Sequence, residues 1–121
     1  MNNIDYFNQL FTEKYQEKIS ELKRFYDRCA EKIPRKDGSE SLHKLDQEYD
    51  DGIVELTQLS TNIKSKFSRD VEDQHFRNQK EFGSYCHSKL YGEIESLLEY
   101  HFDSLKGKLQ EILIHYQAMM N

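Results

Sequence analysis

Apolar residues recur at every third or fourth position along most of this chain, and that spacing is the strongest constraint on its fold. Steps of three and four average close to 3.6 residues, the period of a helix with one buried face. Strands favour β-branched residues, and turns favour glycine and proline, yet the sequence contains only one proline, five glycines and two valines. The pattern therefore predicts an all-α protein, a bundle of three long antiparallel amphipathic helices with coiled-coil-like packing.

The 121 residues are expected to form a single three-helix domain. Pro34 ends the first helix, because proline lacks a backbone N–H and disfavours helical geometry in the residue before it. The segment Pro34–Ser39, rich in turn-forming residues, is the clearest turn in the sequence. The helices are predicted at about 3–33, 40–70 and 74–119.

The turn between the second and third helices is less distinct, because no glycine or proline lies between Ile53 and Phe82. Basic residues before position 70 and acidic residues after it suggest a helix end followed by a helix start. This charge order places the turn near 69–75. A rival interpretation continues the second helix to Phe82 and breaks it at Gly83.

The third predicted helix has more apolar residues than one buried face requires, especially between Leu97 and Met119. A helix of this kind needs cover from more than one side. We therefore expect it to bury its surplus against a second copy or a partner helix, with Leu98, Phe102, Leu113 and Ile114 as the chief surplus. The predicted partner interface comprises Leu98, Phe102, Leu105, Leu109, Ile112, Leu113, Ile114 and Tyr116.

The formal net charge of −5 argues against a nucleic-acid partner, which would require a basic surface. It also disfavours binding to anionic membranes, and no uncharged run is long enough to span a bilayer. Acidic residues concentrate in the first half of the second helix, where they could steer a basic partner. This predicted steering surface comprises Asp46, Glu48, Asp50, Asp51 and Glu55.

The sequence contains none of the common nucleotide-binding, metalloprotease or hydrolase motifs, so we expect no catalytic residues, no cofactor and no enzymatic activity. Glu72 and His75 have the Glu-x-x-His spacing of helical di-iron sites. Such sites need a second motif, so a metal-binding bundle is an alternative and not the main prediction. Cys29 and Cys86, without a visible export signal, are expected to be free thiols in the cytoplasm.

One short segment of the second helix, Leu56-Thr57-Gln58-Leu59-Ser60-Thr61-Asn62-Ile63-Lys64-Ser65-Lys66-Phe67, resembles the middle helix of the N-terminal three-helix domain of syntaxins. That resemblance implies, as an alternative function, a membrane-trafficking regulatory domain that binds a SNARE helix or its chaperone. It covers these twelve residues only and does not assign the chain to a family. The main expectation is a non-enzymatic interaction protein: an adaptor, a chaperone-like protein or an assembly subunit.

Overall fold

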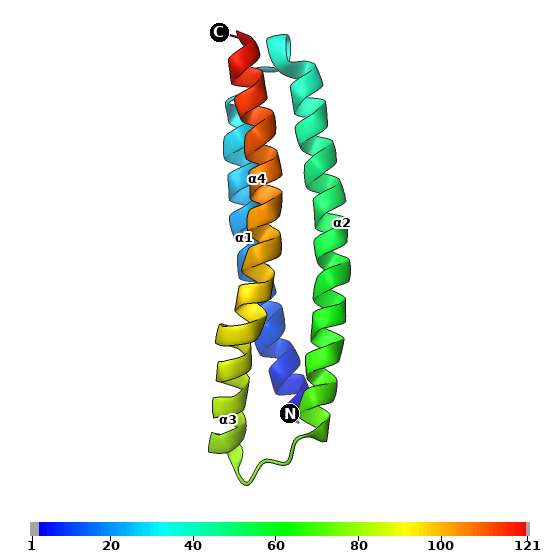
Figure 1. Ribbon diagram of the computed structural model, residues 1–121, viewed down its shortest axis with the longest axis vertical. Helices are drawn as coiled ribbons and strands as arrows, with labels where there is room; N and C mark the ends of the chain where they lie inside the picture. Colours follow the sequence, from blue (N-terminus) through cyan, green and yellow to red (C-terminus); the bar gives the residue numbers. More distant parts are fainter. Residues whose placement is uncertain (1–2, 121) are drawn as a thin grey trace.

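A computed structural model, which describes residues 3–120, shows the predicted all-α bundle (Figure 1). Helix α1 runs over Asn3–Glu31 and α2 over Arg35–Asp73. The third long helix consists of α3 (Gln79–Ser88), a π-helical segment (Lys89–Ile94) and α4 (Glu95–Met120). Successive long helices run in opposite directions, so α1 and α4 are parallel to each other and antiparallel to α2.

One continuous core fills the space between the three long helices. Helix α1 contributes Phe7, Phe11 and Leu22, which follow the predicted 3.6-residue stripe and are almost fully buried. Large aromatic and aliphatic side chains from the other helices complete the core, and each stabilises the fold by about 1.5–3 kcal/mol. No helix within residues 3–120 combines the length and the apolar character that a bilayer-crossing segment needs.

The first turn is shorter than the predicted Pro34–Ser39, because it occupies residues 32–34 and α2 begins at Arg35 and not near residue 40. Residues 32 and 33 close the end of α1 with backbone hydrogen bonds to residues 29 and 30, of 3.2 and 3.1 Å. Helix α2 starts directly after Pro34 but is kinked at Gly38, whose backbone is not helical. A side chain at Gly38 would collide with Ile33 and lie 3.0 Å from the Tyr116 ring. The kink thus lets the hairpin pack tightly against the end of α4.

The second turn lies at residues 74–78, later than the predicted 69–75 and earlier than the rival break at Gly83. The acidic residues that were expected to start the third helix instead occupy the last turns of α2. The third helix starts at Asn78, whose side chain accepts a hydrogen bond of 2.9 Å from the backbone N–H of Glu81. An asparagine followed three residues later by glutamate is a recognised helix start. That signal, and not the charge order, marks the boundary.

The π-helical segment at Lys89–Ile94 explains which residues of the third helix are buried. Six apolar residues follow one another at intervals of exactly four: Phe82, Cys86, Leu90, Ile94, Leu98 and Phe102. In a regular α-helix each step of four turns the side chain by about 40° away from the previous one. A π-helical turn contains more residues and corrects this drift, and all six side chains are at most 3% exposed. The long helix bends at this segment (Figure 1).

Candidate functional site

The bundle itself covers most of the predicted partner interface. Leu98, Phe102, Leu105, Leu109, Leu113 and Tyr116 are all buried within the three-helix core. Three of the four residues expected to be surplus are therefore core residues, because the π-helical segment rotates α4 by about one position relative to the predicted stripe. Ile112 is half-buried, and Ile114 remains exposed at 53%. Of the predicted interface, only these two residues are not buried in the core.

Polar contacts between the helices are distributed unevenly. Among residues 3–120, every side-chain hydrogen bond or ion pair that joins two helices has one partner on α1. Lys14 and Lys18 of α1 form ion pairs of 2.9 and 3.2 Å with Glu95 and Glu99. Hydrogen bonds join α1 to α2 through Tyr15–Thr57, Asn8–Ser68 and Tyr26–Asp46. Within residues 3–120, no side-chain hydrogen bond or ion pair joins α2 to α4.

Three adjoining hollows follow the line along which α2 and α4 meet, and together we call them the α2–α4 groove (residues 37–59 of α2 and 101–120 of α4). The first, of about 240 Å³, lies around Gly52. The second, of about 340 Å³, shares Glu48 and Lys108 with it. The third, of about 290 Å³, reaches the Gly38 kink and Met119. The hollows thus adjoin one another along the line where, in the described part of the chain, no side-chain hydrogen bond or ion pair joins α2 to α4.

Gly52 fixes the depth of this groove. A Cβ atom at this position would lie 2.5 Å from Cδ2 and 3.1 Å from Cγ of Leu105. The absent side chain lets α4 approach the α2 backbone closely, and Leu105 fills the space. The floor beside it is apolar, with Leu56 buried and Leu59 and Ile112 half-buried. Close packing against Leu105 is therefore the reason for a glycine in mid-helix.

The structure divides the predicted acidic steering surface between two sides of α2. Asp46 faces α1, where it accepts the hydrogen bond from Tyr26, and the Tyr26 and Tyr49 rings are stacked 4.4 Å apart. Glu48, Asp51 and Glu55 line the α2–α4 groove. Of the five predicted residues, only these three line the groove, because neither Asp46 nor Asp50 belongs to its lining.

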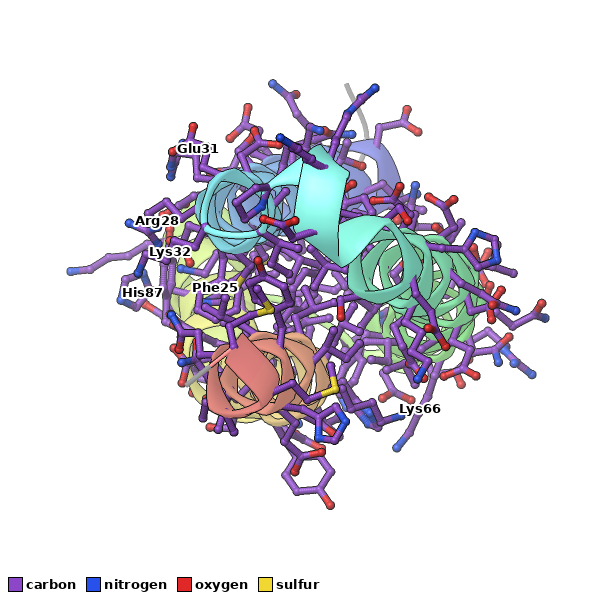
Figure 2. All side chains as sticks on the ribbon, turned by 90° about the horizontal axis from the view of Figure 1, so that it is seen from above. Phe25, Arg28, Glu31, Lys32, Lys66 and His87 are labelled. Carbon is purple, nitrogen blue, oxygen red and sulfur yellow. The ribbon has the colours of Figure 1, made fainter. Side chains whose placement is uncertain are left out.

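Basic side chains lie on the part of α1 that is remote from the α2–α4 groove, together with the acidic Glu31 (Figure 2). Arg28 and Lys32 lie on the side of α1 away from α2 (Figure 2). Lys106 of α4 lies 6.0 Å from the centre of the Phe25 ring, which places a further cation where α1 meets α4.

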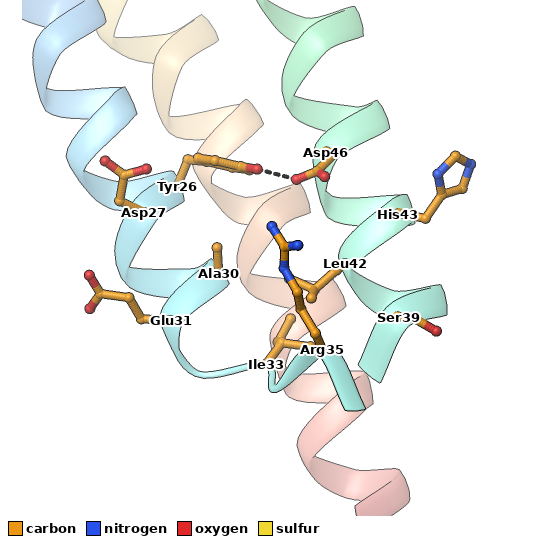
Figure 3. A pocket seen from close by; sticks show the side chains of 10 residues that line it. All are labelled: Tyr26, Asp27, Ala30, Glu31, Ile33, Arg35, Ser39, Leu42, His43 and Asp46. Carbon is orange, nitrogen blue, oxygen red and sulfur yellow. Dashed lines mark hydrogen bonds between the residues drawn. The ribbon is translucent and has the colours of Figure 1, made fainter. Parts of the chain in front are cut away.

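A further hollow, of about 690 Å³, lies at the α1–α2 hairpin (Figure 3). The Arg35 side chain extends into it towards Asp46, while His43 points away. Burial and the hydrogen bond to Asp46 raise the pKa of Tyr26 well above its ordinary value of 10.0. The phenol therefore stays protonated and serves as a hydrogen-bond donor. Because the chain's own arginine occupies this hollow, the α2–α4 groove is the stronger candidate site.

The structure does not assemble the predicted metal motif. Glu72 lies in the last turn of α2 and His75 in the segment that follows, so the two do not share a helix face. Within residues 3–120, no group of three or more histidine, cysteine, aspartate or glutamate side chains could hold a metal ion. Cys29 and Cys86 are free and buried, and burial raises the pKa of the Cys86 thiol to about 11. Burial of this kind is typical of structural cysteines.

Sequence reasoning missed part of the groove, notably Lys44, Ser104, Lys108 and His115. Their spacing shows only that they flank an apolar stripe. It does not show which two helices lack polar contacts with each other. Comparison of the chain with known protein families, with curated proteins and with solved structures found no match.

Proposed function

We propose that this chain is a non-enzymatic interaction protein whose α2–α4 groove receives a helix from a partner protein. In this role it would act as an adaptor, a chaperone-like protein or an assembly subunit. The observation that carries the proposal is that the hollows adjoin along α2 and α4, which share no side-chain hydrogen bond or ion pair within residues 3–120. Amphipathic helices commonly bind in apolar grooves of this kind.

The groove takes over the role expected for the apolar face of the third helix. The apolar face of α4 is buried in the core. A partner would therefore contact only the edge of that face, at Ile112, together with Leu59 of α2. Exposed apolar residues on the outer side of α4, such as Tyr100 and Ile114, stand apart from the groove lining. Two free, buried thiols support the cytoplasm, a reducing compartment, as the location. Export of a tagged chain would contradict this location.

Nuclear magnetic resonance can test the proposal with a defined probe. The probe is a 22-residue amphipathic helical peptide whose apolar stripe is flanked by equal numbers of lysine and glutamate. We expect saturable shift changes in the ¹⁵N-labelled full chain, confined to residues 37–59 and 101–120. Shift changes centred on the faces of α1, or no saturable change with this peptide or with more basic ones, would contradict the proposal.

Two neighbouring residues of α4 provide matched variants. Ile112→Gln alters the groove, whereas Ile114→Gln alters an equally apolar residue that is exposed outside it. We expect only the first to weaken peptide binding, with thermal melting confirming that both variants fold. Light scattering should give the monomer mass of 14.5 kDa for the wild type. A dimer that dissociates in Ile112→Gln would identify a second copy, and not a partner helix, as the occupant.

A further inference from the structure

We propose that the partner helix of the α2–α4 groove is basic along its polar flanks. This inference rests on the proposed function of the groove and adds the chemistry of its occupant. Glu48, Asp51 and Glu55 are spaced by three and four residues, so they form one row along the edge of α2. All three are exposed, and within the described part of the chain none makes an ion pair or a side-chain hydrogen bond. Their carboxylates remain open to an incoming cation.

The α4 side of the groove does not neutralise this row. In the first hollow, Lys108 is the only lysine or arginine that faces the three carboxylates. Glu111 follows it one turn later, beside Ile112. At the far end, Asp37 and Glu40 outnumber Lys44. The groove is therefore acidic in its first and third hollows, whereas Lys44 and Lys108 balance Glu48 and Glu111 in the second.

The apolar floor of the groove determines where the basic residues of a partner helix would lie. Leu59 and Ile112 are half-buried and bordered by the acidic row, so a complementary surface has an apolar stripe between basic residues. Lysine and arginine have long apolar stems, which lets them cover the groove edge while their charged ends reach the carboxylates. An amphipathic helix with lysine or arginine on both flanks has this arrangement.

Charge also argues against the other occupants. A second copy that presented its own groove would bring two acidic rows together, which is unfavourable. From Gly38 to Leu59 the groove follows α2 for about 30 Å, the length of a helix of about 20 residues.

Two peptides with the same apolar stripe test the inference by fluorescence anisotropy. One is a 22-residue helix flanked by lysine and arginine, and its twin is flanked by glutamate. The full-length groove variant is Glu48→Gln/Asp51→Asn/Glu55→Gln. The control, Glu72→Gln/Asp73→Asn/Asp103→Asn, removes the same charge from exposed residues outside the groove. Thermal melting confirms that both variants fold.

We expect the basic peptide to bind the wild type at least tenfold more tightly than its acidic twin. It should lose about tenfold in affinity for the groove variant, as expected for three exposed charge pairs, and little for the control. Equal binding of the twins, or equal losses in both variants, would overturn the basic-helix inference while leaving helix binding intact. Failure of both twins and of the mixed-charge peptide would overturn the proposed function as well.

Discussion

Replacing Gly52 with alanine tests how closely α2 and α4 approach each other. In an open helical position this change stabilises a protein by about 1 kcal/mol, because alanine has the higher helix propensity. At Gly52, however, the new Cβ would lie 2.5–2.6 Å from both Cδ atoms of buried Leu105. Forcing a methyl group into a packed interface costs about 1–3 kcal/mol. We therefore expect Gly52→Ala to lower the free energy of unfolding by up to about 2 kcal/mol.

Gly107→Ala is the matched control, because nothing lies within 4 Å of a Cβ at Gly107 in α4. It should raise stability by about 1 kcal/mol. Urea denaturation, followed by the circular dichroism of the helices, gives the free energy of unfolding of both variants. The difference between the two free energies measures the cost of the collision with Leu105, which we expect to be about 1–3 kcal/mol. Combining Gly52→Ala with Leu105→Ala should recover that amount in a double-mutant cycle. Equal stabilisation by the two alanines would refute the close approach of α2 and α4.

Three further measurements address the hairpin, the core thiols and the α1–α4 contact. Burial and the Asp46 carboxylate raise the pKa of the Tyr26 phenol in the folded chain. Above about pH 10 this phenol ionises in the unfolded chain first, so the free energy of unfolding of the wild type should fall as the pH rises. The difference in this free energy between the wild type and Tyr26→Phe should therefore become smaller over that range. Cys29 and Cys86 should react with a thiol reagent at pH 8 only after unfolding in urea, and one rapidly reacting thiol in the native protein would contradict their burial. Glu95→Gln should cost about 1 kcal/mol in a thermal melt at low salt, and less at high salt, because it removes the partly buried ion pair with Lys14.

The sequence predicts the fold class well because helical periodicity is a local property. The apolar period of α1 predicts its buried face without any information on the other helices. Phe7, Phe11 and Leu22 are buried as this period predicts. Pro34 likewise ends a helix through its own covalent geometry. Local rules of this kind apply before any packing partner is known.

The candidate site was harder to predict because it depends on relations between helices. From the sequence alone, Gly52 predicts a locally weak helix. The structure shows that Leu105 fills the space that a side chain at this position would take. The repeated spacing of four from Phe82 to Phe102 does contain a usable signal, since only a π-helical turn keeps all of these residues on one face. A regular 3.6-residue period places Leu98 and Phe102 beside the core face and predicts a partner contact for them, whereas the structure buries both in the core.

The displaced second turn shows which local forces prevail when they compete. Ending α2 with Asp70, Glu72 and Asp73 opposes the helix dipole, at a cost of about 0.3–1 kcal/mol for each charge. Extending the helix buries Val71, worth about 1.5–3 kcal/mol, and the Asn78 cap contributes about 1 kcal/mol more. In the connecting segment, Phe76 packs 5.1 Å from the Phe82 ring, which adds about 0.5–1.5 kcal/mol. Burial and capping together outweigh the dipole, so charge order alone misplaces a helix end wherever an apolar residue beyond it can reach the core.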